Sequence, residues 1–313
     1  MSSSLAPVAL FAFNRPAHTA RTLAALAASP LAAGSDVYAF LDGPRHDDER
    51  ARVDDVRAVL ADAAGFARVR VHATEANRGL FASLTEGIGK VLAVHQAVIV
   101  VEDDIEVAPG FLGYMNSALD RYRDVAAVGS IHGYSPPIAG LPKRYFLRGG
   151  DCWGWATWAD RWSLFNPDAR ELLLQLRRRR ALRAFMRSHG AAPLLQLVKR
   201  ARGRNQSWAT LWHASLFLAD RYTLHPGTSL VANIGCDGSG THSRREELAH
   251  AQWPQRLDAP LPGQVTEDAE AARRLSRYLD RGAAGRVPIP GWVLRGYALA
   301  LARIEAGRRG AAR

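Results

Sequence analysis

Three consecutive carboxylates, Glu102, Asp103 and Asp104, directly follow the apolar, β-branched run of residues 98–101. Such a run is typical of a strand that is covered on both faces in a parallel sheet. Carboxylates about 4 Å apart repel each other by about 1 kcal/mol in water, and by about 4 kcal/mol at an effective dielectric constant of about 20. A divalent cation such as Mg²⁺ or Mn²⁺, which prefers oxygen ligands, would offset this repulsion.

The other interpretation of the carboxylates is a charged turn that caps the next helix. The apolar strand before them favours a ligand site, because open α/β sheets bind ligands at the carboxyl ends of their strands.

The first hundred residues alternate between strand and helix patterns, which predicts a parallel sheet with crossover helices. We expect strands at residues 7–13, 37–41, 69–72 and 97–102, and helices at residues 17–28 and 47–63, with a third helix after residue 79. The first two strands end in turn-forming polar residues, NRP and DGP, so polar side chains gather at one edge of the sheet. No G-x-G-x-x-G motif follows the first strand, so a dinucleotide-binding Rossmann fold is not supported.

Tryptophans concentrate in the stretch GGDCWGWATWADRW, residues 149–162. The alternation of Trp153 and Trp155 suits an extended segment that shows both rings on one face. Tryptophans are more often core residues, but the flanking glycines and Asp151 favour a partly open wall for a sugar or an acceptor. A helix expected from residue 205 onwards would add Trp208 to this wall.

The segment NIGCDGSGTH, residues 233–242, is rich in glycine and hydroxyl groups. Such a loop can direct backbone N–H groups at a phosphate. It could equally be a flexible surface turn, and the sequence leaves both interpretations open.

The chain has 313 residues and a formal net charge of +11, with basic clusters at residues 177–180 and 199–204. No nucleic-acid-binding motif accompanies these clusters, so we do not expect nucleic acid as a partner. Anionic substrates and an anionic membrane surface explain the charge equally well. In the absence of repeats and linkers, we divide the chain into a catalytic domain, residues 1–245, and a helical C-terminal extension, residues 246–313.

The segment LAPVALFAF near the start of the chain lacks the features of a secretory signal and is interpreted as the first strand. Two cysteines are too few for a disulfide framework, which favours a cytoplasmic location. The C-terminal segment from residue 288 has one apolar helical face. This helix could lie on the inner face of a membrane as a peripheral anchor, or pack against the domain.

Taken together, the motifs FNRP, FLDGPR, NRGL, VIVVEDDIEVAPGF, CWGWATW and GSGTH resemble nucleotide-sugar glycosyltransferases of the GT-A fold, in particular bacterial enzymes related to family two. The acidic run is similar to that of the N-acetylglucosaminyltransferases that initiate complex N-glycans. The resemblance spans about residues 7–245 and implies an α/β fold with a mainly parallel sheet. Residues 1–110 would form its nucleotide-binding half and residues 111–245 its acceptor and sugar half.

The resemblance also implies roles for single residues. Asp104 would coordinate Mn²⁺ or Mg²⁺ at the diphosphate, Asp103 would face the ribose, and Glu102 would bind the donor sugar. The nucleotide would be held by residues at the other strand ends and in the glycine-rich loop, with a carboxylate favouring uracil and hence a UDP-sugar; these are Arg15, Asp42, Asn77, Arg78, Gly238, Ser239 and His242.

Inverting relatives carry a carboxylate base just before a tryptophan, where this chain has Gln206-Ser207-Trp208. Neither Gln206 nor Ser207 is a competent base at neutral pH. Either Asp151 or another carboxylate takes this role, or the segment is misaligned, or the protein has lost transfer activity; of these we favour Asp151. The predicted function is therefore inverting, metal-dependent transfer of a sugar to a cell-envelope glycan or lipid-linked acceptor. A nucleotidyltransferase that makes the nucleotide sugar and a non-catalytic carbohydrate-binding protein are the alternatives.

Overall fold

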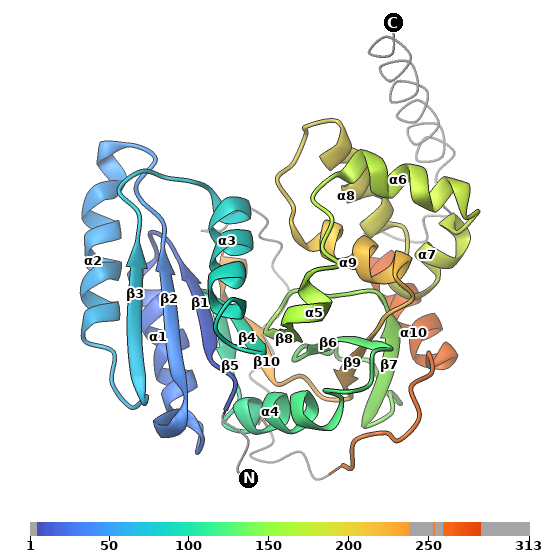
Figure 1. Cartoon of the computed structure of the whole chain (residues 1–313), viewed down its shortest axis with the longest axis horizontal. Coiled ribbons are helices and arrows are strands. Elements are labelled where there is room, and N and C mark those ends of the chain that lie inside the picture. Colours follow the sequence, from blue (N-terminus) through green and yellow to red (C-terminus); the bar gives the residue numbers. More distant parts are fainter. Residues whose placement is uncertain (1–4, 238–252, 254–258, 283–313) are drawn as a thin grey trace, which may run out of the picture.

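A computed structural model describes residues 5–237, 253 and 259–282 of the chain. It contains an eight-stranded sheet in the order β3-β2-β1-β4-β8-β6-β9-β7 and a small sheet that pairs β10 with β5 (Figure 1). The strands are β1 Val8–Ala12, β2 Asp36–Leu41, β3 Arg68–Ala73, β4 Ala97–Glu102, β5 Ile105–Val107, β6 Val128–His132, β7 Arg144–Arg148, β8 Trp155–Trp158, β9 Tyr222–Pro226 and β10 Val231–Asn233. The α-helices are α1 Pro16–Ala27, α2 Arg50–Ala61, α3 Leu80–Leu92, α4 Phe111–Arg121, α5 Ala159–Trp162, α6 Ala169–Arg178, α7 Leu182–His189, α8 Ala192–Ala201, α9 Ala209–Leu218 and α10 Ala269–Gly282.

The large sheet joins a parallel half to a mixed half. Strands β3, β2, β1 and β4 are parallel to one another. Strand β8 runs antiparallel to both β4 and β6, β6 is parallel to β9, and β7 is antiparallel to β9. This arrangement confirms the predicted α/β class with a mainly parallel sheet.

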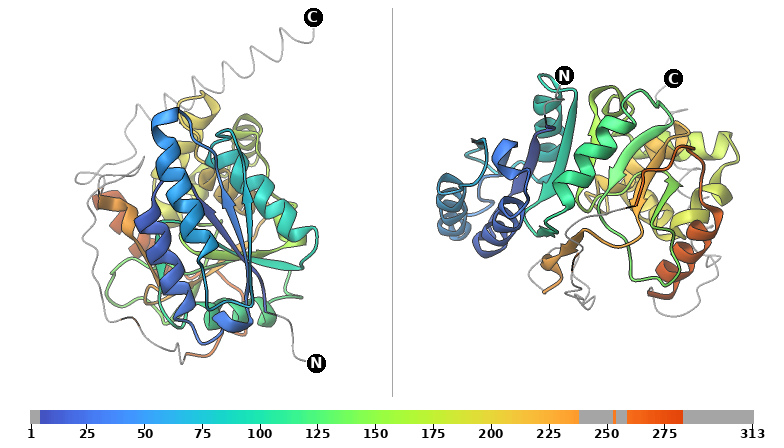
Figure 2. Two further views of the ribbon diagram at one scale, coloured as in Figure 1. Left: turned by 90° about the vertical axis from the view of Figure 1, so that its left-hand side faces the viewer. Right: turned by 90° about the horizontal axis from the view of Figure 1, so that it is seen from below.

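Helices cover both faces of the sheet, as Figure 2 shows. Side chains alternate along β1, so that Val8 and Leu10 pack into one hydrophobic cluster while Ala9 and Phe11 pack into another. Helices α1, α2 and α4 contribute to the first cluster, and α3 and α9 contribute to the second. Burial on both faces explains why the central strands are apolar throughout rather than alternating.

The predicted helix boundaries need three corrections. Helix α1 begins one residue earlier than expected, with Pro16 in its first turn, where a missing N–H costs nothing. The expected helix at residues 47–63 is a short 3₁₀ turn, Asp47–Glu49, followed by α2. The helix expected from residue 205 begins at Ala209 instead, because the Asn205 side chain is held by hydrogen bonds to Gln196.

The described part of the C-terminal extension packs on the rest of the molecule. The backbone N–H of Asp268 donates to the carbonyl oxygen of Phe146 in β7 at 2.9 Å, and α10 contacts α7. The predicted helix of residues 288–313 lies outside the described residues. Among the helices that are described, each is too short or too polar to cross a bilayer.

Candidate functional site

The acidic cluster of Glu102, Asp103 and Asp104 lies at the carboxyl end of β4, beside the end of β1. Parallel pairing places Phe11 opposite Glu102, and the backbone N–H of Asp103 donates to the carbonyl oxygen of Phe11 at 2.9 Å. The Asp103 carboxylate in turn accepts the backbone N–H of Phe13 at 3.1 Å. The first strand therefore fixes both the backbone and the side chain of Asp103.

Arg15 supplies the positive charge that faces this cluster. Its guanidinium group forms an ion pair with Asp103 and a second one with Asp104, with an N–O distance of 3.0 Å. When all three carboxyl groups are ionised, one guanidinium offsets only one of their charges. The remaining negative charge is what a bound divalent cation would compensate.

Burial and crowding raise the pKa values of two of these carboxyl groups. The pKa of Glu102 rises to about 8, first because burial disfavours its charged form and then because of Asp104 and Asp103. The pKa of Asp103 rises to about 6, again mainly through burial, although Arg15 acts in the opposite direction. Burial and the neighbouring carboxylates thus disfavour the charged forms of both groups.

Gly235 is a site residue that the sequence prediction missed. The backbone N–H of Ile234 donates to the carbonyl oxygen of Asp104 at 2.8 Å, so the chain after β10 returns to the acidic cluster. A Cβ atom on Gly235 would lie 2.3 Å from Oδ2 of Asp104 and 2.9 Å from Nη1 of Arg15. Only the glycine-rich composition of residues 233–242 hinted at such a close approach. The predicted phosphate contacts Gly238, Ser239 and His242 lie outside the described residues.

Asp42 at the end of β2 holds the loop that leads into α3. Its Oδ1 atom accepts the backbone N–H of Arg78 at 2.8 Å, and its Oδ2 atom accepts that of Gly79 at 2.8 Å. The Asn77 side chain donates to the carbonyl oxygen of Gly43 at 2.8 Å, in the same loop. The Arg78 side chain points elsewhere and pairs with Glu86. The structure thus brings Asp42 and Asn77 together through the loop backbone.

Two of the three predicted wall tryptophans are core residues, which corrects the prediction of an open wall. Trp155 is fully buried and Trp208 is 4% exposed, and their rings stack with centroids 5.6 Å apart. The expected alternation fails because Gly154, with φ of +58°, interrupts the extended backbone between Trp153 and Trp155. Trp153 is only partly buried and packs against Tyr134 in an edge-on contact with centroids 4.7 Å apart.

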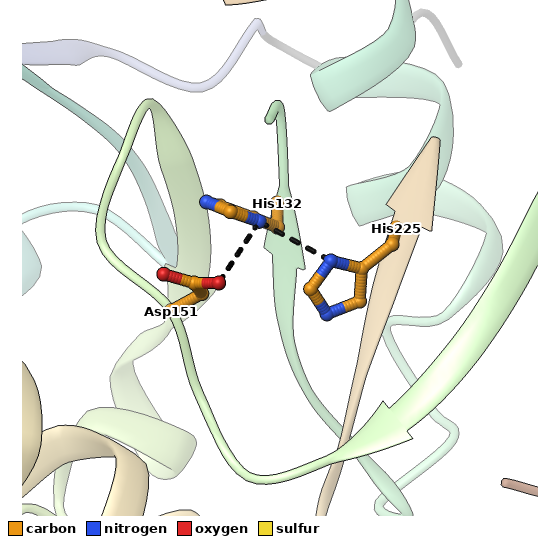
Figure 3. Close-up of side chains that lie close together, drawn as sticks. All are labelled: His132, Asp151 and His225. Carbon is orange, nitrogen blue, oxygen red and sulfur yellow. Dashed lines mark hydrogen bonds and ion pairs between the residues drawn. The ribbon is translucent and has the colours of Figure 1, made fainter. Parts of the chain in front are cut away.

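Asp151 lies among histidines that come from separate elements. One carboxylate oxygen, Oδ2, is 3.5 Å from Nδ1 of His132 in β6 and 4.0 Å from Nε2 of His189 in α7. Figure 3 shows that the side chains of Asp151, His132 and His225 point toward one another. His225, in β9, places its Nδ1 atom 3.2 Å from that of His132. The Asp151 side chain is 31% exposed, whereas the histidines are buried.

Hydrogen bonds define the protonation of the two central histidines. The Nε2 atom of His132 accepts the backbone N–H of Trp153 at 3.2 Å, so the ring proton of neutral His132 is on Nδ1. This Nδ1–H faces both His225 and Asp151. Burial lowers the pKa of His132 to about 3, and burial together with His132 lowers that of His225 to about 3. Both rings are therefore neutral at pH 7.

The ligand atoms of His132, Asp151 and His225 all lie within 4.8 Å of one another, close enough to hold a metal ion. A metal bound to Nδ1 of His132 would, however, shift the ring proton to Nε2. That proton would then face the N–H of Trp153 at 3.2 Å, which places two donors against each other. The hydrogen bonds thus fit proton sharing better than metal coordination at this group.

No carboxylate occupies the segment that carries the base in inverting relatives. Gln206 accepts a hydrogen bond from Arg200, and the backbone N–H of Ser207 donates to Asn205 at 3.3 Å. Desolvation raises the pKa of Asp151, while His225, the backbone N–H of Cys152 and His213 lower it. The Asp151 carboxylate is thus partly exposed, with a pKa above the ordinary value for an aspartate.

The mixed sheet and the carboxylates that follow β4 define the class of GT-A nucleotide-sugar transferases, as the motifs predicted. Residues 8–179, more than half of the chain, match the model of glycosyl transferase family 2, and the chain belongs to this family. A crystal structure of TarS from S. aureus aligns with a TM-score of 0.29 and 16% sequence identity, over 44% of this chain and 23% of TarS. The chain thus spans about a quarter of the length of TarS. No curated protein sequence matches the chain.

Proposed function

We propose that the protein transfers a sugar from a nucleoside diphosphate donor, favouring a UDP-sugar, to a hydroxyl group of a glycan or lipid-linked acceptor with inversion. The observation that carries this proposal is the placement of two unlike carboxylate sites on paired strands. The acidic cluster ends β4, and Asp151 precedes β8, whose Trp155 pairs with Val100 of β4. Membership of glycosyl transferase family 2 supports the reaction class.

The donor half of the proposed site uses the acidic cluster. Oxygen ligands and uncompensated negative charge fit Mn²⁺ or Mg²⁺, and we assign Asp104 as the ligand because its carboxylate is more exposed than that of Asp103. When bound, the ion would offset the charge that develops on the leaving diphosphate. We assign Asp103 to the ribose side and Glu102 to the donor sugar.

We assign nucleotide recognition to Asp42, Asn77 and Arg78, with Arg15 on the side of the acidic cluster. Oδ2 of Asp42 accepts a single hydrogen bond from the described residues and has a lone pair left for the N3–H of uracil. The phosphate role of Gly238, Ser239 and His242 stays a prediction from the sequence. We keep Trp153, which is partly buried, as the one candidate for a sugar-contacting ring.

We assign Asp151 as the base that takes the proton of the acceptor hydroxyl. Its Oδ1 atom is held by the backbone N–H of Cys152 at 2.8 Å, and its Oδ2 atom faces the Nδ1–H of His132. His132 is a positioning residue, since its ring is itself oriented by Trp153 and His225. General base catalysis requires a group of suitable pKa that is held within hydrogen-bond reach of the proton it takes. A cytoplasmic location, with the C-terminal segment at the inner face of a membrane, is consistent with this proposal.

Paired variants test the two halves of the site separately. Asp104→Asn should weaken the binding of UDP in the presence of Mn²⁺ at least about 10-fold, because it removes the assigned ligand. Asp151→Asn should leave UDP binding unchanged but slow sugar transfer at least about 100-fold, because general base catalysis contributes about 10²–10⁴. Calorimetric titration of UDP and turnover with a panel of UDP-sugars give the two readouts.

Asp160→Asn is a matched control, since this carboxylate is 67% exposed and pairs only with neighbouring Arg161 among the described residues. It should change neither readout. Unchanged UDP binding in Asp104→Asn would refute the donor site, and full turnover in Asp151→Asn would remove this residue from the mechanism.

A further inference from the structure

The positive charge of the chain is concentrated in a single segment. The whole chain has 41 basic and 30 acidic residues, a net charge of +11. Residues 169–204 contain 11 of the basic residues and one acidic residue, Glu171, which gives this segment a net charge of +10. The rest of the chain, with 30 basic and 29 acidic residues, is close to neutral.

This segment, which we call the basic cap, folds as the three packed helices α6, α7 and α8 and the turns around them. Figure 1 shows these helices together on the side of the molecule away from α2 and β3. Their leucines form the interior of a separate hydrophobic cluster, with Leu172, Leu173 and Leu197 fully or almost fully buried. Since the apolar side chains face inward, the arginines are left on the outside.

Few of these cations have an acidic partner in the described part of the chain. Arg178 pairs loosely with Glu171 at 3.7 Å, and Arg179 lies 3.9 Å from Asp220. The exposed side chains without an ion pair to any described residue are Arg180, Arg183, Arg187, Lys199 and Arg204. Cations near the C-terminus of a helix are stabilised by the helix dipole. This effect does not explain why the segment has only one carboxylate.

We propose that the basic cap docks on a lipid bilayer that contains anionic headgroups. A dense group of unpaired cations binds such a surface electrostatically, with about a fivefold gain per Lys or Arg near the surface. Large apolar side chains that are exposed in the described residues, Val71, Leu80, Val94 and Leu279, all lie outside the cap. The cap therefore adsorbs on the headgroups without inserting into the acyl chains.

The same composition disfavours nucleic acid as the partner. Proteins that bind single strands stack bases on aromatic side chains. The cap has one aromatic side chain, Phe185, and it is fully buried against Phe217. A lipid surface needs only the charge.

The cap is also connected to the candidate site. His189, the last residue of α7, is 4.0 Å from the carboxylate of Asp151. If the acceptor is lipid-linked, which rests on the proposed function, docking of the cap brings the proposed base close to the membrane that carries the acceptor. Docking itself does not depend on sugar transfer.

Vesicle flotation with the full chain tests the docking. The protein should float with vesicles of phosphatidylcholine and phosphatidylglycerol but not with phosphatidylcholine alone. Replacing four unpaired cations in the variant R180Q/R183Q/R187Q/K199Q should lower the partition coefficient at least about 100-fold. The control R50Q/R52Q/R57Q/R68Q removes the same charge from exposed positions outside the cap and should bind more than 10-fold better than the cap variant.

Salt provides a second measurement on the unmodified protein, independent of whether a variant folds. Because electrostatic adsorption is screened within about 3 Å at about 1 M salt, wild-type protein should then leave the anionic vesicles. Three results would overturn the proposal: equal flotation of the cap variant and the control, salt-resistant binding, or binding to duplex RNA without binding to vesicles. These experiments do not measure sugar transfer. A failure of vesicle binding would leave the proposed function untouched, and a failure of sugar transfer would leave the docking proposal untouched.

Discussion

At the scale of single residues, the acidic cluster lies in close contact with the backbone of Gly235. Asp104, Arg15 and Gly235 meet from three distant parts of the chain, and a Cβ atom at Gly235 would clash with both of the other side chains. The position of the Asp104 carboxylate is thus fixed by a neighbour that has no side chain of its own.

Gly235→Ala should lower the affinity for UDP with Mn²⁺ at least about 10-fold, or about 1.4 kcal/mol. The new methyl group would lie 2.3 Å from Oδ2 of Asp104 and must displace that carboxylate. Titration of UDP measures the effect. Gly89→Ala is the matched control, because a Cβ there meets nothing within 4 Å and alanine favours the helix. If Gly235→Ala binds UDP with wild-type affinity, the Asp104 carboxylate can move without loss of binding, which would contradict the role of Gly235 in fixing its position.

The sequence predicted the acidic cluster because strand and carboxylates are adjacent in the chain. It could not predict the surroundings of Asp151, since His132, His189, His213 and His225 come from β6, α7, α9 and β9. Nothing in their spacing indicates that they meet. Only the tertiary structure shows that a partly exposed carboxylate faces a neutral histidine pair.

At the scale of elements, the loop between β3 and α3 is organised by Asp42 from the neighbouring strand. The carboxylate accepts the backbone N–H groups of Gly43, Arg78 and Gly79 and the hydroxyl group of Thr74. Two of these donors lead into the first turn of α3, where N–H groups lack partners within the helix. Asp42 thus caps α3 from outside that helix.

Asp42→Ala should lower the free energy of unfolding by about 3 kcal/mol, because it leaves buried N–H groups without an acceptor. Urea titration followed by circular dichroism measures this. Asp47→Ala is the control: its side chain is 93% exposed and pairs only with Arg50 among the described residues. A surface pair of this kind contributes less than about 1 kcal/mol. Equal effects of the two substitutions would contradict the capping role.

Element prediction succeeded where a periodic pattern was uninterrupted. The bounds predicted for β4 are those observed, β2 differs by one residue at one end, and β1 differs by one residue at each end. The tryptophan segment failed because Gly154 adopts a left-handed conformation, which a two-residue alternation cannot reveal. Trp155 and Trp208 were assigned to a substrate wall, yet their large apolar surfaces are buried between β8 and α9.

At the scale of the whole molecule, buried neutral histidines make stability depend on pH. The pKa values of His132 and His225 are about 3 in the folded protein, against about 6.5 for a histidine in an unfolded chain. Between these values the unfolded state binds more protons at these positions than the folded state does. The stability they contribute is therefore present above about pH 6.5 and is lost as the pH falls.

His225→Gln should reduce the loss of stability between pH 7.5 and 5 by up to about 1.4 kcal/mol per pH unit, since one buried titrating group is removed. The readout is the slope of the unfolding free energy against pH. A variant that is less stable by the same amount at every pH has the same slope. Glu102 and Asp103, with raised pKa values, act with the opposite sign in both proteins and cancel in the comparison. An unchanged slope in His225→Gln would contradict the assignment.

The antiparallel pairing of β4 with β8 sets a limit on how the enzyme can move. Val98, Ile99 and Val100 are in register with Thr157, Ala156 and Trp155, so ladder hydrogen bonds join the parallel half of the sheet to its mixed half. A slip by one residue would shift the strands by about 3.3 Å and turn every side chain to the other face. The two halves therefore cannot hinge apart at this seam. We therefore expect opening to admit a donor and release a product to occur in the loops beyond the strand ends, including the loop that carries Asp151, while β4 and β8 stay paired.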